Sequence, residues 1–409
     1  MNEVLSLPQI RLDLARRIAT HAQNGTTDRS DIIMRNDVSV YIDPERFEQE
    51  KQKLFLGLPQ TVCLSNDLPA PGHYVLFEDL GIPMIVLRDK TGKVRAFLNT
   101  CIHRGAKLVT EPKGKLSRIT CMFHAWTFDL DGALKAVPQS QHFCDLHDRQ
   151  QLVEYPADER YGIVFVQATV GGSFDLDAHL GDYASQLKAL RLDQAEWVAS
   201  DVLRSNANWK FTLDTYVENY HFATVHRDSL TPTFANNMLL FDSWGPHHRV
   251  VFPTRVSEGQ GKLPESEWDI DSYPIPFYIF PNTIIFAGSL SPGQNYITVF
   301  RHYPDGLGKM YSKVAIYAPE GIQSREQEEA IKEAFTAIVT LLQNEDYEMT
   351  SSSYKNLSSL PGDFKVIYGR TELALQNMHL HFAQAIGAME PEITPATAPD
   401  GAALASGAA

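Results

Sequence analysis

Two short clusters of cysteine and histidine constrain the fold of this sequence more than any other feature. Cys101 and His103 form the first cluster, Cys121 and His124 form the second, and the segment between them is rich in lysine and arginine. Two thiolates and two imidazoles can hold a [2Fe-2S] centre asymmetrically, with the cysteines on one iron and the histidines on the other. The pattern therefore predicts a Rieske-type [2Fe-2S] centre carried by two loops.

A structural zinc site is the alternative for these four residues, because two cysteines and two histidines also suit tetrahedral zinc. Zinc fingers usually place their cysteines in one short pair and their histidines in another, whereas each cluster here contains one residue of each type. The spacing therefore favours iron and sulfide. The remaining cysteines, Cys63 and Cys144, leave no framework of disulfides.

The composition excludes several classes of protein. Of the 409 residues, 44% are hydrophobic and 21% are charged, which is typical of a globular chain with more than one domain. A formal net charge of −14 argues against nucleic acid as a partner. No apolar run is long enough to cross a bilayer and the first residues lack the pattern of a secretory signal, so we expect a cytoplasmic protein with no membrane partner.

Turn residues and apolar periodicity divide the chain into four parts. Residues 1–37 contain an amphipathic helix, residues 38–170 contain short β-like runs, and residues 171–389 combine helices with longer alternating segments. Residues 390–409 are rich in proline, alanine and glycine, which predicts a disordered tail. We therefore predict an α+β protein, with a small all-β domain that carries the cysteine and histidine loops and a second domain that contains an antiparallel sheet.

A second group of candidate metal ligands opens the second domain. Asp214, Glu218 and His221 have the spacing of one helix face, and His226 falls off that face, so the helix should end before it. Two histidines with one carboxylate bind non-haem Fe(II) and leave positions open for O2 and substrate. On their own the two histidines would more often be buried structural residues. The predicted iron–sulfur centre in the same chain favours iron.

The carboxylate that completes such a site must come from elsewhere in the sequence. A strongly periodic helix between residues 325 and 349 ends with Glu345 and Asp346. Both acids lie about equally far from the centre of its apolar stripe, so helical periodicity does not choose between them. A solvated helix end is the alternative explanation for this acidic pair.

With these residues, the chain resembles the alpha, or catalytic, subunits of the Rieske non-haem iron oxygenases, the aromatic-ring-hydroxylating dioxygenase family. The likeness runs from Val40 to about Phe382 and includes CIHRG, CMFHAW, NWKFTLDTYVENYHFATVH and QNEDYEM. It implies a helix-grip fold for the second domain. It implies that the cluster ligands are Cys101, His103, Cys121 and His124. Because the family places its acidic ligand second in an acidic pair, it also implies that the Fe(II) ligands are His221, His226 and Asp346.

The resemblance also implies how the two sites work together. Family members form head-to-tail trimers, alone or with a small beta subunit, and the cluster of one subunit passes electrons to the iron of its neighbour. Glu218 would contact His124 across this interface and couple the two sites. Electrons would come from NAD(P)H through a separate reductase or ferredoxin. Five basic residues against Glu111 alone in the cluster segment indicate that the donor is acidic.

The implied function is that of a terminal oxygenase, which uses O2 and these electrons to hydroxylate a small organic, aromatic substrate. Glu218 departs from the pattern of the aromatic-ring dioxygenases, which generally have aspartate at this bridging position. Oxygenases of carnitine and betaine type have glutamate at it. A monooxygenase of a quaternary-ammonium substrate is therefore the alternative. A Rieske electron carrier or redox sensor without oxygenase activity is a function of a different class. We expect the substrate pocket near Phe211, Phe222, Phe234, Met238, Phe280 and Phe286.

Overall fold

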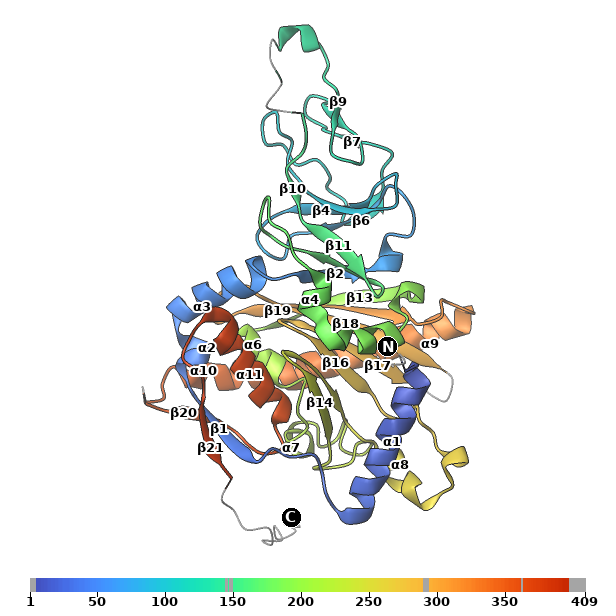
Figure 1. Cartoon of the computed structure of the whole chain (residues 1–409), viewed down its shortest axis with the longest axis vertical. Coiled ribbons are helices and arrows are strands. Elements are labelled where there is room, and N and C mark those ends of the chain that lie inside the picture. The colour runs from blue at the N-terminus through green and yellow to red at the C-terminus, as the bar shows by residue number, and fades with distance from the viewer. Residues whose placement is uncertain (1–4, 144–145, 147–149, 290–293, 362, 397–409) are drawn as a thin grey trace.

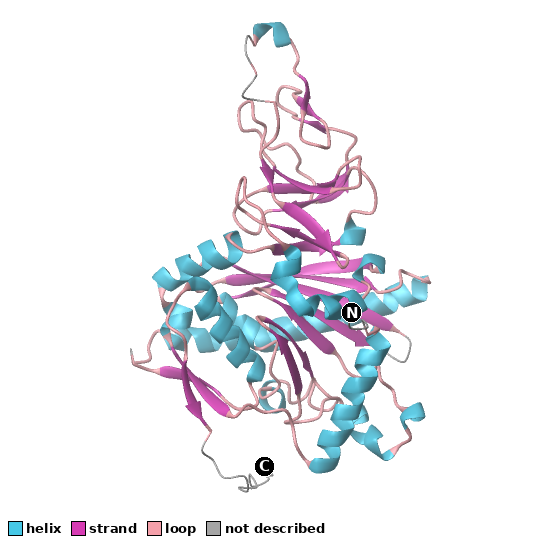
Figure 2. Cartoon of the chain, in the orientation of Figure 1, coloured by secondary structure: helices cyan, strands magenta, loops and turns pink. Residues whose placement is uncertain are grey.

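The chain folds into a narrow β-rich part that stands on a broader part made of helices and sheet (Figure 1). The computed structural model describes residues 5–143, 146, 150–289, 294–361 and 363–396. Helices and antiparallel strands are both abundant (Figure 2), and the predicted α+β fold is confirmed. None of the helices within these ranges combines the length and the apolarity that a membrane crossing requires.

The narrow part consists of three small antiparallel sheets within residues 60–166. The largest has the strand order β10-β5-β4-β3-β6, and its central strand β4 is buried because its apolar residues pack on both faces. The sheet β7-β8-β9 lies at the far end of the molecule (Figure 1), and the sheet β11-β12-β2 lies nearer the broad part. The strands are β2 (Gln60–Leu64), β3 (His73–Phe77), β4 (Met84–Arg88), β5 (Val94–Leu98), β6 (Lys113–Lys115), β7 (Ile119–Thr120), β8 (Thr127–Phe128), β9 (Leu134–Ala136), β10 (Glu154–Tyr155), β11 (Ala157–Arg160) and β12 (Ile163–Val166).

A seven-stranded antiparallel sheet forms the centre of the broad part. Its order is β13-β19-β18-β17-β16-β15-β14, so most neighbours in the sheet are also neighbours in sequence. Such pairing lets each strand be joined to the next by a short connection. The strands are β13 (Glu196–Ser205), β14 (Leu240–Trp244), β15 (His247–Val251), β16 (Ile275–Ile279), β17 (Thr283–Ser289), β18 (Asn295–Pro304) and β19 (Met310–Ala318).

Alternate residues of this sheet face different layers, as the strand period requires. On β18, Thr298 faces the layer of α9 (Arg325–Leu342), whereas Ile297 joins the core beneath α1 (Leu7–Asn24). The amphipathic helix expected near the N-terminus corresponds to α1. A π-helical turn, η8 (Gln343–Tyr347), follows α9 directly. The sheet and α9 therefore enclose a space between them.

Shorter helices lie around the central sheet of the broad part (Figure 2), and α6 among them is buried. The α-helices are α2 (Ser39–Ile42), α3 (Pro44–Glu50), α4 (Leu176–Leu180), α5 (Ala184–Ala189), α6 (Trp209–Asp214), α7 (Phe222–Val225), α8 (Arg255–Gly259), α10 (Glu348–Leu357) and α11 (Leu373–Ile386). One further π-helical turn is η1 (Lys51–Leu56). The 3-10 turns are η2 (Ser65–Asp67), η3 (Ser140–His142), η4 (Gly181–Tyr183), η5 (Leu192–Gln194), η6 (Gln260–Lys262) and η7 (Glu265–Glu267).

A small sheet pairs segments from the two ends of the chain. The central strand β1 (Ile32–Asp37) pairs with β20 (Lys365–Tyr368) on one side and with β21 (Glu392–Pro395) on the other. The prediction of disorder from residue 390 is therefore wrong for β21, because backbone hydrogen bonds to β1 order a segment whose composition favours disorder. Residues 397–409, the rest of that predicted tail, lie outside the described residues.

A buried ion pair ties α3 to α6, the helix that leads to the second candidate site. The fully buried carboxylate of Glu50 accepts hydrogen bonds from Lys210 Nζ at 2.5 Å, Trp209 Nε1 at 3.2 Å and Arg46 Nε at 3.2 Å. Burial lowers the pKa of Lys210, and the charge of Glu50 acts against that shift. The charge on Lys210 therefore depends on Glu50.

Glu50→Gln should lower the free energy of unfolding by about 3 kcal/mol, because it leaves the Lys210 ammonium buried without a counter-charge. Urea unfolding followed by tryptophan fluorescence measures the loss. Glu48→Gln is the matched control, since Glu48 is exposed and lies 3.8 Å from Lys51, and exposed pairs contribute little. Equal losses in the two variants would contradict this role of Glu50.

Candidate metal centres

The two cysteine and histidine loops close with the same backbone pattern. The amides of Cys101 and Cys121 each donate to the carbonyl five positions later, at 2.8 and 2.9 Å, and each cysteine carbonyl accepts from the amide four positions later. The residues that donate those amides, Gly105 and Ala125, have φ values of 77° and 58°. This left-handed conformation lets the chain turn back sharply after each cluster. The loops are thus two matched turns.

The structure brings the two predicted cysteine ligands together and the two predicted histidine ligands together. Cys101 and Cys121 are buried, and burial together with the neighbouring Cys121 raises the pKa of the Cys101 thiol. The rings of His103 and His124 lie 4.8 Å apart, and His103 stacks on Trp126. The buried Nδ1 of His124 has no hydrogen-bond partner among the described residues. Paired thiols beside a free imidazole nitrogen fit a [2Fe-2S] centre.

The predicted helix face shared by Asp214, Glu218 and His221 is absent. The helix α6 ends at Asp214, and a turn connects it to α7. The Glu218 carboxylate accepts hydrogen bonds from the backbone amides of Tyr220 and His221. Such side-chain acceptors compete with the carbonyls of a helix for backbone donors, which explains the early end of α6. The turn places Glu218 directly beside His221.

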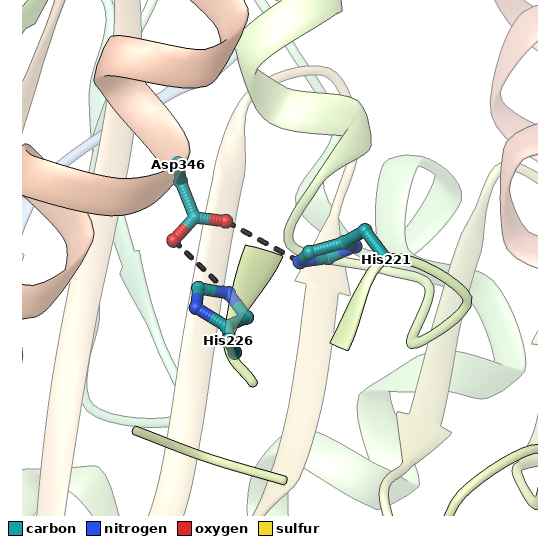
Figure 3. Close-up of side chains that lie close together, drawn as sticks. All are labelled: His221, His226 and Asp346. Carbon is teal, nitrogen blue, oxygen red and sulfur yellow. Dashed lines mark ion pairs between the residues drawn. The ribbon is translucent and has the colours of Figure 1, made fainter. Parts of the chain in front are cut away.

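His221, His226 and Asp346 meet at one point although they come from two distant segments (Figure 3). One atom of each lies within 4.8 Å of the others. Asp346 Oδ1 is 3.4 Å from His221 Nε2, and Oδ2 is 3.3 Å from His226 Nε2. Within the described part of the chain, His221 Nε2 and Asp346 Oδ2 are buried without a hydrogen-bond partner. Buried atoms left unpaired around one point fit a bound metal ion.

Hydrogen bonds on the far sides of the two imidazoles suit metal binding. His221 Nδ1–H donates to Glu218, and His226 Nδ1–H donates to Glu345 Oε2 at 2.5 Å. A proton held at Nδ1 leaves Nε2 free to bind a metal. Burial acts to lower the pKa of His221, but Asp346 and Glu218 outweigh it and raise the pKa to about 9. The carboxylates therefore create a site that favours positive charge.

The two neighbouring acids occupy different positions. Asp346 lies between the histidines, whereas Glu345 contacts the far side of His226 and accepts from Ser229 Oγ at 2.6 Å. Both acids lie in the π-helical turn η8. A π turn changes the angle between successive side chains, so neighbours in sequence can reach opposite sides of one imidazole. Sequence reasoning missed the contact of Glu345 with His226, for which the acidic pair itself was the only signal.

An apolar cavity of about 170 Å³ lies beside His221, His226 and Asp346. Its wall comes from the segment around α7, from strands β17 and β18 and from α9. No lysine or arginine is among the described residues that line it. The aromatic residues of the wall are Tyr216, Phe222, Phe234, Phe252, Phe286, Tyr296 and Phe300.

The expected pocket residues divide into two groups. Three of them line this cavity, namely Phe222, Phe234 and Phe286. The other three pack in the surrounding core, namely Phe211, Met238 and Phe280. An apolar residue is recognised from sequence, but the layer that it faces depends on how distant segments pack. The cavity residues on α9, which include Ile338 and Leu342, were missed for the same reason.

The domain with the seven-stranded sheet brings together two histidines and a carboxylate, which suit a mononuclear metal site. The loops of the β-rich domain suit a [2Fe-2S] centre. Together these sites define a class of protein that pairs electron transfer with a mononuclear metal site. The family model described as the Rieske [2Fe-2S] domain matches residues 59–156. The model described as the ring hydroxylating alpha subunit (catalytic domain) matches residues 192–388. The chain belongs to the Rieske non-haem iron oxygenases, as an alpha subunit.

Relatives within this family differ in their substrates. The carnitine monooxygenase oxygenase subunit of Acinetobacter baumannii is 28% identical over 71% of this chain and 78% of its own length. The anthranilate 1,2-dioxygenase large subunit of Acinetobacter baylyi is 32% identical over 46% of this chain and 41% of its own. Among solved structures, a quaternary ammonium Rieske monooxygenase in complex with L-carnitine is similar in fold, with a TM-score of 0.73, 22% identity and coverage of 87% of this chain and 96% of that chain.

The family establishes the class of enzyme and its cofactors. The protein is a Rieske-type oxygenase with a [2Fe-2S] cluster and a mononuclear iron, as predicted. Naphthalene 1,2-dioxygenase from a Rhodococcus species, bound to indole, has the same fold with a TM-score of 0.71, 18% identity and coverage of 92% of this chain and 98% of that chain. The fold is therefore shared by oxygenases that act on very different molecules, and the substrate must be inferred from the cavity.

Proposed function

We propose that the protein is the terminal oxygenase of a system that hydroxylates a neutral, largely apolar substrate of the aromatic class. In this proposal the cluster ligands are Cys101, His103, Cys121 and His124. The ligands of the mononuclear iron are His221, His226 and Asp346.

The lining of the cavity is the observation that carries this choice of substrate. Apart from the proposed iron ligands, none of the described lining residues is charged. A carnitine-like substrate carries both a quaternary ammonium and a carboxylate. Aromatic rings can hold the ammonium through cation–π contacts, but a buried carboxylate needs a positive charge or several hydrogen-bond donors. The wall supplies no such cation, so a neutral aromatic substrate fits it better.

A monooxygenase of a quaternary-ammonium substrate is the second candidate function. The carnitine monooxygenase subunit is matched over 78% of its length, whereas the anthranilate dioxygenase subunit is matched over 41%. The glutamate at Glu218 is also the residue that oxygenases of carnitine and betaine type have at this position. These observations concern the whole chain and the proposed bridge between metal sites, whereas the lining concerns the substrate directly.

Substrate-dependent O2 uptake by the iron-loaded enzyme with a reductase separates these functions. Naphthalene and indole should stimulate uptake and yield hydroxylated products detected by mass spectrometry, because they match the apolar wall. Carnitine and glycine betaine should leave uptake at its substrate-free rate. The reverse pattern would support the second candidate function. A cluster that is reduced while none of these four compounds stimulates uptake would contradict both candidate functions.

The residues of the chain prepare the iron site for this reaction. When bound, the cluster supplies single electrons and the mononuclear iron supplies O2 activation. Glu218 and Glu345 hold the Nδ1 protons of the histidines and so fix the orientation of both rings. The aromatic wall excludes water and holds the substrate beside the two histidines and Asp346.

We further propose that electrons reach the iron from a neighbouring subunit in a head-to-tail trimer. The cluster loops and α7 lie far apart along the long axis of the chain (Figure 1). Beside His124, Met122 is 89% and Phe123 is 56% exposed, and beside Glu218, Tyr220 is 74% exposed. Exposed apolar side chains next to each site are typical of contact surfaces. A ring that joins these surfaces would bring His124 of one subunit to Glu218 of the next.

The electron donor in this family is a reductase or a ferredoxin. On the cluster domain, Lys107 pairs with Glu78 at 2.8 Å and Lys113 lies 3.5 Å over the ring of Trp197. Lys115 is exposed on the same strand as Lys113. We propose that Lys115, rather than its paired neighbours, attracts an acidic donor, because an exposed cation steers a partner of opposite charge.

A further inference from the structure

One hydroxyl in the wall of the cavity is buried without a partner. Thr298 lies on β18 and is 1% exposed, and its Oγ1 has no hydrogen-bond partner among the described residues. Phe286, its partner across the strands, and Phe300, its neighbour on the same face, also line the cavity. A buried hydroxyl without a partner is unfavourable, so its presence in an apolar wall requires an explanation.

The other polar atoms in the interior of the wall have partners or a proposed role. The unpaired atoms of His221 and Asp346 face the proposed iron position. Thr215 Oγ1 donates to a carbonyl of α6 at 3.0 Å. The hydroxyl of Tyr216 is bonded to that of Tyr347 at 2.8 Å. Thr298 Oγ1 is the unpaired hydroxyl that these contacts do not explain.

Tyr296 marks the outer end of the cavity. It lines this cavity and also a second cavity of about 710 Å³, which lies partly at the ends of β17 and β18. Gly288 also lines that second cavity, and a Cβ atom built on it would lie 2.6 Å from the hydroxyl oxygen of Tyr296. The hydroxyl of Tyr296 therefore lies over Gly288, at the end of the strands where the two cavities meet, whereas Thr298 lies two residues further along β18 in the interior of the wall.

We propose that Thr298 determines substrate specificity by forming a hydrogen bond with one polar group of the substrate. The substrate is then an aromatic compound with a single hydrogen-bonding group, such as a ring N–H or a hydroxyl, set in an otherwise apolar skeleton. The bond fixes how the ring is turned in the cavity and so selects the carbon that faces the iron position. This inference rests on the proposed function for the reaction, but the binding step stands by itself.

Anaerobic equilibrium binding of indole and indene to the holoenzyme tests this role. The two molecules have nearly the same shape, and only indole carries an N–H donor. The wild-type enzyme should bind indole about fivefold more tightly than indene, which is the size expected of one net hydrogen bond. Thr298→Val keeps the branched shape without the hydroxyl and should remove or reverse this preference. Thr298→Ser keeps the hydroxyl and should retain the preference.

A wild-type enzyme that binds the two probes equally, or binds neither, would overturn the proposal. An unchanged preference in Thr298→Val would do the same. The melting temperature of substrate-free Thr298→Val gives a second readout. It should be equal to or higher than that of the wild type, because the variant removes an unpaired buried hydroxyl. A clear decrease would show that the hydroxyl bonds to the protein, and that result also overturns the proposal.

The binding measurements also separate this inference from the proposed function. If indole binds in a Thr298-dependent manner but stimulates no O2 uptake, the proposed function fails and the binding role stands. If aromatic compounds are hydroxylated while Thr298→Val changes neither relative affinity nor the position of hydroxylation, the binding role fails and the proposed function stands.

Discussion

Asp346→Ala should remove the mononuclear iron and lower substrate-dependent O2 uptake by more than about 100-fold, a larger loss than that expected from residues that only orient metal ligands. The carboxylate of Asp346 faces both histidine Nε2 atoms, at 3.3 and 3.4 Å. It is the only acid of the proposed ligand set, and without it two neutral imidazoles bind iron poorly. The visible absorption of the cluster should persist, because the cysteine loops lie in the narrow part. Iron and sulfide analysis with an absorption spectrum measures both outcomes.

Glu345→Gln is the matched control for this variant, because it changes the neighbouring acid. The glutamine oxygen can still accept the Nδ1 proton of His226, so iron should remain bound with about tenfold weaker affinity. If Glu345→Gln lost its iron while Asp346→Ala kept it, Glu345 would be the iron ligand and the assignment of Asp346 would be wrong. His221→Ala should behave like Asp346→Ala and keep the colour of the cluster.

Glu218→Gln should keep both metal centres but slow electron transfer from the cluster to the iron by about 100-fold. This is the largest effect expected from a residue that contacts a metal ligand without binding the metal itself. Glu218 contacts the Nδ1 of His221 and, in the proposed ring, also reaches His124 of the neighbouring subunit. A neutral amide keeps the contact within the chain and removes the charge that would link the two histidines. Reoxidation of a pre-reduced cluster on mixing with O2 and substrate, followed by stopped-flow absorption, measures the rate.

Asp228→Asn is the control for Glu218→Gln, since Asp228 is an exposed acid on the same segment. It should leave the rate of cluster reoxidation unchanged. If Glu218→Gln loses iron in parallel with activity, Glu218 acts by holding His221 alone and the bridging role is wrong. Normal cluster reoxidation in Glu218→Gln would contradict the bridge as well.

The sequence predicts best those features that depend on local chemistry. Each cysteine loop is one tight turn in which a cysteine and a histidine stand within a few residues of each other, so the identities of Cys101 and His124 already indicate the role proposed for them. The end of α6 was not predicted, because the Glu218 side chain takes two backbone donors that helical periodicity assigns to the helix. The choice between Glu345 and Asp346 was open for a related reason, since periodicity assumes an α-helix and the chain forms a π turn there.

Features that depend on distant contacts could not be predicted from the sequence. Phe222 and Phe211 are both aromatic residues close to the same helix, yet only Phe222 lines the cavity, because the position of α9 decides which side chains meet. The role proposed for the Thr298 hydroxyl could not be predicted from the sequence either, since threonine is common in strands for reasons of shape alone. Its significance depends on which other polar atoms around the cavity already have partners.

The small sheet β20-β1-β21 has a consequence for the order in which the protein folds. Strand β1 is made early, but both of its partners lie at the other end of the described chain. Closing so long a loop is slow and costs entropy, whereas the strands of the narrow part all have their partners within residues 60–166. During synthesis β1 therefore has no partner on either edge until the end of the chain is made. An unpaired strand edge can pair with another chain. Helix α11 also comes late, and its His379 bonds Asp214 at 3.0 Å, so the surroundings of the proposed iron site are completed after the cluster domain has folded.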